Sequence, residues 1–178
     1  MLTLFHAVVA ATAVERLVEL VVSTRNARWA FARGGVERGR EHFPPMVALH
    51  TALLVASVAE VHLADRPFLP AVGWTAVIVV LAAQGLRWWC IATLGHQWNT
   101  RVIVVPGMPL VRSGPYRWLR HPNYLAVVAE GLALPLVHSA WLTAVCFTVL
   151  NAILLLGARI PTEERALAEL VGATGRAR

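Results

Sequence analysis

Lysine is absent from this sequence, and charged residues of either sign are scarce. All 16 basic residues are arginines, and charged residues together make up 15% of the 178 positions. Ordinary soluble domains carry about 25% charged residues. With 57% hydrophobic residues, the chain cannot cover itself with polar surface. A soluble monomer is therefore excluded, and the same numbers exclude a disordered chain.

Cysteine is nearly absent as well. Cys90 and Cys146 both lie in apolar stretches, which excludes a disulfide framework and a cysteine-based metal cage. The sequence also lacks the G-x-G-x-x-G loop that binds dinucleotides, and it shows no Ser-His-Asp set and no cysteine nucleophile. We expect no metal in this protein.

The sequence contains several long apolar runs. A membrane-spanning helix needs about 20 mostly apolar residues, and Pro122 suits the first turn of such a helix. Five stretches approach that length: Leu2–Val22, Met46–Ala64, Leu69–Leu94, Asn123–Val137 and Ala140–Ala158. We predict an all-α integral membrane protein with about five transmembrane helices in a single domain, residues 1–178. Three spans lie within residues 1–94, and region 95–178 contains a helical hairpin, residues 123–158, with its turn at His138-Ser139.

The arginines predict the orientation of these spans, because cytoplasmic loops are enriched in basic residues. Only Arg66 falls in a loop on the opposite side, so we expect the N-terminus outside and the C-terminus in the cytoplasm. The same rule explains the net charge of +6 without a nucleic-acid partner. The composition, rich in Arg, Ala and Val, is typical of a bacterium and its plasma membrane. Thirteen arginines share the cytoplasmic side: Arg25, Arg28, Arg33, Arg38, Arg40, Arg101, Arg112, Arg117, Arg120, Arg159, Arg165, Arg176 and Arg178.

Several polar residues fall inside the predicted spans, where a charge costs roughly 2.5–3.5 kcal/mol on insertion scales. One interpretation is a set of interhelical ion pairs that hold the bundle together. The other is a polar cavity open to the cytoplasm, since several of these residues fall in one half of the membrane. The residues concerned are Glu15, Arg16, Glu19, Gln84, Arg87, Glu130 and Asn151.

The segment Leu94–Leu167 is too polar at its start to span a membrane, yet it is rich in aromatic residues. Within it, Val102–Val105 predicts a short strand. Thr162 is a candidate N-cap for a helix with an acidic first turn. Upstream, Arg33–Arg40 (RGGVERGR) predicts a flexible basic loop. Taken singly, each of these features has an ordinary structural explanation.

In combination, the motifs of this segment resemble the isoprenylcysteine carboxyl methyltransferase family. The sequence GPYRWLRHPNY contains Arg120-His121-Pro122-Asn123-Tyr124, and the acidic pair Glu163-Glu164 follows about forty residues later. LGHQWNTR and LVRSGPYR also resemble the family, and the likeness covers the C-terminal half of the chain. The resemblance implies S-adenosylmethionine as a methyl donor that enters from the cytoplasm. It implies donor contacts for Arg120, His121, Tyr124, Glu163 and Glu164, to which we add Gly114 and Tyr116.

The resemblance also implies a lipophilic acceptor that arrives through the bilayer. Members of the family methylate the carboxylate of prenylated cysteine, and the bacterial branch is similar to enzymes that O-methylate long-chain alkylpyrones; the sequence leaves both acceptors open. Arg159, just before the acidic pair, is our candidate catalytic residue that orients an anionic oxygen, because a guanidinium can bond two oxygens at once. Arg87 and Asn151 are weaker substrate candidates. An acceptor that is already ionised needs no general base.

Two other functions remain open on the sequence. A membrane reductase of the sterol-reductase type would use NADPH and would need further basic or polar contacts for its extra phosphate. A non-catalytic accessory protein would carry polar residues in both halves of the membrane. A soluble methyltransferase of the Rossmann type is excluded by the missing glycine-rich loop.

Overall fold

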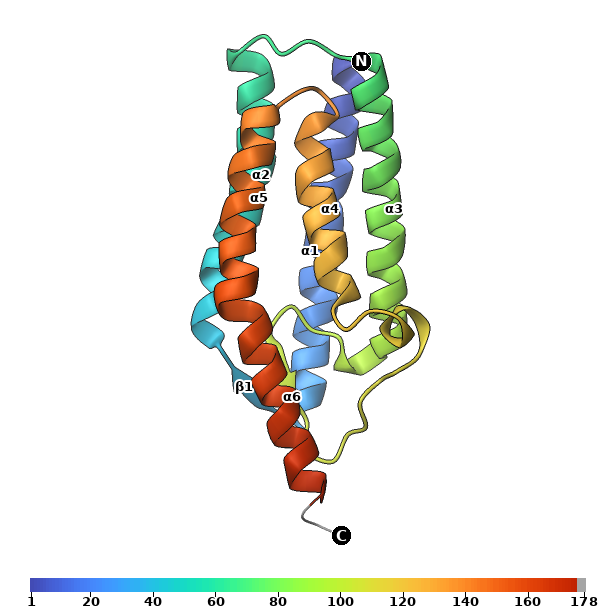
Figure 1. The fold of residues 1–178 in the computed structure, drawn as a ribbon, viewed down its shortest axis with the longest axis vertical. Coiled ribbons are helices and arrows are strands. Elements are labelled where there is room, and N and C mark those ends of the chain that lie inside the picture. The colour runs from blue at the N-terminus through green and yellow to red at the C-terminus, as the bar shows by residue number, and fades with distance from the viewer. Residues whose placement is uncertain (176–178) are drawn as a thin grey trace.

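The computed structural model describes residues 1–175, and side-chain burial as far as Glu169; Arg176 and Arg178 of the predicted orientation lie outside the described residues. Helices α1 (Leu2–Phe31), α2 (Phe43–Leu63), α3 (Pro70–Leu94), α4 (Pro122–Leu136) and α5 (Trp141–Leu154) stand side by side in a bundle, and α6 (Ile160–Gly175) extends beyond it at the end opposite the start of α1 (Figure 1). The long α3–α4 connection and the short sheet lie at the end where α6 extends. The strands of this sheet are β1 (Val36–Arg38) and β2 (Val102–Val104).

Three of the described helices are long and apolar enough to cross a membrane: Arg40–Leu63, Pro70–Gln97 and Trp141–Glu169. This agrees with an all-α membrane protein. The helix α1 carries Glu15, Arg16 and Glu19 in its middle, and α4 has only 15 residues. At about 1.5 Å per residue, α4 is shorter than the roughly 30 Å hydrocarbon core. The expected count of five crossings therefore stays a prediction for these two helices.

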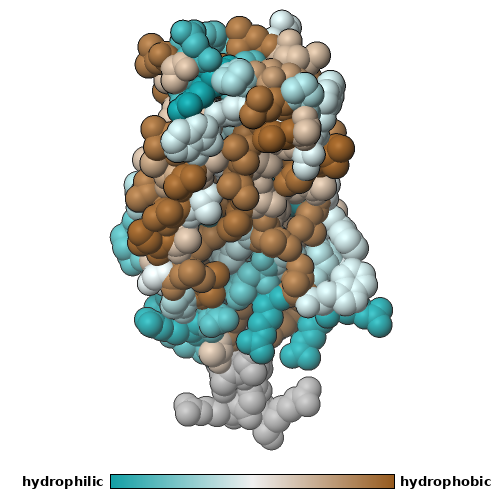
Figure 2. All heavy atoms as spheres, turned by 45° about the horizontal axis from the view of Figure 1, so that its top comes forward, coloured by the Kyte–Doolittle hydropathy of each residue, from teal (hydrophilic) through white to brown (hydrophobic). Residues whose placement is uncertain are grey.

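The core of the bundle is apolar. It lies away from the basic end, which is the end of the bundle with the α3–α4 connection and the short sheet. Buried side chains from all five bundle helices meet in the core, among them Phe5, Leu53, Val80, Leu134 and Phe147. Gly131 allows α4 to approach α5 closely, because a Cβ at this position would overlap the ring of Phe147. Apolar side chains also dominate the outer surface between the two ends of the molecule, as a bilayer requires (Figure 2).

Two expectations about local structure are wrong at the basic end. Arg25 and Arg28 belong to the last turns of α1, which runs nine residues past the predicted span. This extension is held because Asn26 donates hydrogen bonds to the carbonyl oxygens of Gly95 (3.1 Å) and Trp98 (2.7 Å). The stretch Arg33–Arg40 is not a flexible loop, because β1 pairs antiparallel with β2, with Glu37 opposite Ile103. The strand expected at Val102–Val105 is present as β2.

The second half of the predicted hairpin continues as one helix from α5 into α6. A single π-helical turn, Leu155–Arg159, joins the two. Thr162 is therefore not an N-cap, because no helix begins there. The wider π turn ends two residues before Pro161, whose ring would otherwise collide with the carbonyl four residues earlier. Such single π turns are frequent at functional sites, and this one ends at Arg159.

Candidate active site

A cavity of about 1190 Å³ lies between the helices. It extends from the basic end, where α6 and the α3–α4 connection line it, into the bundle between α1, α2, α4 and α5. Its charged lining is mostly cationic, with seven arginines against three glutamates: Arg16, Arg87, Arg101, Arg112, Arg117, Arg120 and Arg159, with Glu19, Glu163 and Glu164. The cavity therefore offers an electropositive polar end and an apolar interior to one ligand or to two.

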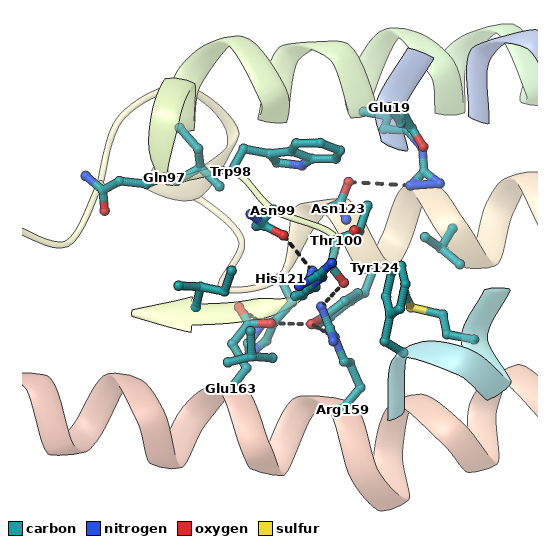
Figure 3. A pocket seen from close by; sticks show the side chains of 18 of the residues that line it. Glu19, Gln97, Trp98, Asn99, Thr100, His121, Asn123, Tyr124, Arg159 and Glu163 are labelled. Atoms are coloured by element: carbon teal, nitrogen blue, oxygen red, sulfur yellow. Dashed lines mark hydrogen bonds and ion pairs between the residues drawn. The ribbon is translucent and has the colours of Figure 1, made fainter. Parts of the chain in front are cut away.

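His121, Tyr124, Glu163 and Glu164 meet at the polar end of this cavity. Pro122 starts α4 and places His121 just before its first turn, facing α6. The Tyr124 hydroxyl donates a hydrogen bond to Glu163. The His121 ring stacks on Tyr124 and lies 3.5 Å from Glu163 and 3.4 Å from Glu164. Figure 3 shows His121, Tyr124 and Glu163 converging from the start of α4 and from α6.

The neighbouring carboxylate of Glu163 raises the pKa of His121 above its ordinary value, and Glu164 adds to this effect. Because the folded-state pKa is raised, protonated His121 stabilises the fold fully below about pH 6.5, and this stabilisation is lost as pH rises through the folded pKa.

We expect the unfolding midpoint of the purified protein to fall as pH rises from about 6.5 through the folded pKa of His121. His121→Gln should flatten this part of the profile. If the unfolding midpoints of His121→Gln and of the unchanged protein depended on pH in the same way, the raised pKa of His121 would be contradicted.

Arg159 joins the polar end of the cavity to the bundle interior. Its side chain is 4% exposed, its Nε donates to the Tyr124 hydroxyl at 3.2 Å, and its Nη2 donates to the Thr100 carbonyl. Nη1 is buried and has no hydrogen-bond partner among the described residues. A buried, unpaired guanidinium nitrogen is costly. The arrangement therefore fixes the guanidinium at the cavity wall and leaves Nη1 without a partner among the described residues.

The segment 95–101 forms the cavity wall opposite α6, and α1 holds it in place. Ser23 of α1 bonds the side chain of Asn99 at 2.8 Å and accepts a hydrogen bond from the Thr100 amide at 3.1 Å. Since the Thr100 carbonyl binds Arg159, this segment links α1 to the end of α5. Trp98, Asn99 and Thr100 line the cavity beside Arg159 (Figure 3).

The buried charges of α1, α3 and α4 form a connected set of ion pairs. Arg16 pairs with Glu19 at 2.5 Å and also with Glu130 of α4. Glu19 in turn lies 2.7 Å from Arg87 Nε on α3. The interpretation as bundle-holding pairs therefore applies to these residues. Arg16, Glu19 and Arg87 also line the cavity, so the same residues pair with one another and contribute polar groups to a cavity.

The structure brings most of the predicted site residues to one cavity. Gly114 is apart from it: with φ of +54° it lies where a Cβ would overlap Thr93 of α3, so it serves helix packing. Among the described residues no three His, Cys, Asp or Glu side chains gather as a metal site requires. The predicted residues that line the cavity are Arg87, Tyr116, Arg120, His121, Tyr124, Asn151, Arg159, Glu163 and Glu164.

Sequence reasoning missed several residues of the cavity wall. His96 to Thr100 and Asn123 lie inside the motifs that carry the resemblance. Their place in these motifs could have assigned them to the site. Asn123 accepts a hydrogen bond from Arg87 at 3.5 Å, which connects the ion-pair set to the start of α4. His50 also lines the cavity, but it lies in an apolar run that gave no signal.

Comparisons with known proteins identify the family to which this region of the chain is similar. The profile of the Isoprenylcysteine carboxyl methyltransferase (ICMT) family matches residues 76–169, which include every predicted site residue. The Uncharacterized protein YpbQ of Bacillus subtilis (strain 168) is 36% identical over 167 residues, covering 93% of this chain and 98% of that protein. An Uncharacterized protein of Haemophilus influenzae is 25% identical over 156 residues, covering 87% of this chain and 90% of that protein. No solved structure gives a significant match.

The matched region begins in α3 and ends in α6. It therefore contains the polar cluster, Arg159 and the wall segment 95–101. Together with apolar helices of spanning length, the match is that of an integral membrane protein of a methyltransferase family. The chain belongs to the isoprenylcysteine carboxyl methyltransferase family.

Proposed function

We propose that this protein is an S-adenosylmethionine-dependent O-methyltransferase that acts on a carboxylate or acidic enol of a lipophilic acceptor. The observation that carries the proposal is the position of Arg159. Arg159 lines one continuous cavity, between a polar cluster that suits a zwitterionic donor and an apolar interior that suits a lipid, and its Nη1 has no hydrogen-bond partner among the described residues.

The polar end fits the donor by its chemistry. S-adenosylmethionine carries an ammonium group, a carboxylate and a sulfonium, and it supplies the methyl group. Glu163 and Glu164 offer carboxylates to the cations. Arg120 lies at the same end and is exposed, so it can meet the donor carboxylate. The aromatic face of Tyr124, or that of Tyr116, can attract the sulfonium.

The interior of the cavity fits the acceptor. Leu20, Val47 and Leu155 line it with apolar surface. Leu17 lines it too and is 63% exposed, and we infer that the cavity opens to the lipid at this point of α1. An acceptor can therefore enter from the bilayer with its acidic group leading toward Arg159, whose guanidinium orients the oxygen. Holding two partners in reacting geometry can contribute about 7–11 kcal/mol to catalysis.

We further propose that the polar end faces the cytoplasm of a bacterium, across its plasma membrane, with the N-terminus outside. Arg101, Arg112 and Arg117 lie at the end of the bundle where the C-terminus lies, whereas Arg66 is in the α2–α3 connection at the other end. That asymmetry is the one the positive-inside rule describes. Both relatives reported above come from bacteria.

Calorimetry on the detergent-purified protein tests the donor. We expect binding of S-adenosylmethionine and of its demethylated product, and no tight binding of NADPH. The physical reason is the acidic pair beside Tyr124, which attracts an ammonium group, and S-adenosylmethionine carries such a group whereas NADPH does not. Tight NADPH binding with no response to S-adenosylmethionine would favour the reductase, and no binding of either would favour a non-catalytic role.

A further inference from the structure

Ser23 is a buried serine in the last third of α1, outside the residues 76–169 that the family profile matches. Its hydroxyl oxygen lies 2.8 Å from Asn99 Oδ1, 2.7 Å from the Thr100 hydroxyl and 3.1 Å from the Thr100 amide nitrogen. A serine hydroxyl has one proton and two lone pairs. Because Asn99 Oδ1 only accepts, Ser23 donates its proton there and accepts from both groups of Thr100. The whole hydrogen-bonding capacity of this hydroxyl therefore holds the wall segment 95–101.

The side-chain amide of Asn99 is fixed in one orientation by the same contacts. Its Nδ2 donates to the Ser23 carbonyl at 3.1 Å, and its Oδ1 also accepts from the Arg101 amide at 2.9 Å. Asn26, about one turn further along α1, donates to two backbone carbonyls of the same segment. Residues 98–101 lie outside helices and strands, so their buried backbone groups need other partners. Side chains of α1 supply these partners, and the path of the segment therefore depends on α1.

Thr100 connects this arrangement to Arg159. Its carbonyl oxygen accepts a hydrogen bond from Arg159 Nη2, while Arg159 Nε donates to the Tyr124 hydroxyl at 3.2 Å. The Tyr124 hydroxyl is itself held by Glu163. A guanidinium is planar, so two acceptors on different nitrogens fix its orientation, whereas one acceptor leaves it free to turn. One of the two acceptors belongs to the polar cluster, and the other depends on Ser23.

We propose that Ser23 is a positioning residue for methyl transfer. By binding the amide and the hydroxyl of Thr100, it fixes the Thr100 carbonyl, and through that carbonyl it orients the guanidinium of Arg159. Thr100 and Arg159 line the cavity and Ser23 does not, so Ser23 acts through them. The inference rests on the proposed function, in which Arg159 orients the acceptor oxygen. It gives α1, which lies outside the matched region, a part in the reaction.

Ser23→Ala removes the hydroxyl, and its effect is measured by transfer of labelled methyl from S-adenosylmethionine into a bacterial lipid extract. We expect turnover to fall about tenfold, because a small displacement of an orienting group is costly in rate. The KM for S-adenosylmethionine and the affinity for S-adenosylhomocysteine should stay unchanged, which also reports that the variant is folded. Ser23→Cys keeps the size of the side chain but forms only weak hydrogen bonds. It should show the same loss, and it replaces Ser23→Ala if that variant does not fold.

Thr24→Ala is the matched control on the same helix. Thr24 is exposed, and its hydroxyl donates to the Leu20 carbonyl of α1 itself. Turnover should therefore remain that of the unchanged protein.

A double-mutant cycle with Arg159→Ala separates positioning from a general structural role. If Ser23 acts through Arg159, adding Ser23→Ala to the Arg159→Ala protein should cause no further loss of transfer. An equal loss in both backgrounds, or full turnover in Ser23→Ala, would overturn this inference and leave the proposed function standing. No transfer by the unchanged protein would overturn both.

Discussion

Arg159→Ala is expected to lower methyl transfer by about 100-fold or more, the cost of removing one fixed donor to a reacting oxygen in known enzymes. Binding of S-adenosylmethionine should stay within a few fold of that of the unchanged protein. The reason is the division of the guanidinium contacts: Nε and Nη2 bind Tyr124 and Thr100, while Nη1 has no hydrogen-bond partner in the part of the chain that the structure describes. Steady-state transfer and calorimetry on the same preparation measure the two effects separately.

Arg159→Lys separates the fork geometry from the charge. Lysine keeps the positive charge, but its single nitrogen cannot reproduce the separated donors by which the guanidinium binds Tyr124 and Thr100 and would reach an acceptor oxygen. Loss of one hydrogen bond to a charged group costs about 1.5–3 kcal/mol, so we expect turnover to fall tenfold or more. Arg165→Ala on the exposed face of α6 is the matched control and should be neutral. Full turnover in Arg159→Lys would contradict the acceptor role and make Arg87 the next candidate.

Glu163→Gln should weaken donor binding by about 1.5–3 kcal/mol, that is tenfold or more, because one carboxylate aimed at a cation is lost. Glu163 is the better placed of the acidic pair, since it accepts from Tyr124 and lies beside His121 within the cavity. Calorimetric titration with S-adenosylmethionine gives the affinity directly.

Two other glutamates of α6 provide the comparison. Glu164 is half exposed and faces His121 alone at 3.4 Å, so we expect a smaller effect from Glu164→Gln than from Glu163→Gln. Glu169 is exposed and pairs with Arg38 at 2.9 Å, away from the cavity, and Glu169→Gln should leave donor affinity unchanged. Equal, small losses at all three positions would leave these residues a structural role only.

Much of the fold was predictable because long apolar runs predict membrane-spanning helices. The α4–α5 hairpin and its start at Pro122 follow from local sequence signals. The extension of α1 past Val22 and the pairing of β1 with β2 were not predictable, because both depend on partners far along the chain. Asn26 needs the carbonyls of Gly95 and Trp98, and Glu37 needs Ile103 across the sheet.

The candidate site was also predictable in part, where its residues belong to local sequence motifs. His121, Tyr124 and Glu163 carry recognisable motifs, and the structure brings them together. Gly114 belongs to the same motif, yet it packs on α3, because a glycine's role depends on which chain approaches it. His50 could not be assigned to the cavity from the sequence, because a histidine in an apolar run does not reveal which cavity it lines or that it contacts the Met46 carbonyl.

Transfer of a labelled methyl group from S-adenosylmethionine into lipid tests the central claim most directly. The purified protein would be incubated with labelled donor and a bacterial lipid extract, and the label would be counted in the organic phase beside Arg159→Ala and Arg165→Ala. The account predicts label in lipid with the unchanged protein and with Arg165→Ala, and at most about one hundredth of it with Arg159→Ala. Label that stays in the aqueous phase, or that reaches the lipid equally with Arg159→Ala, would contradict the account.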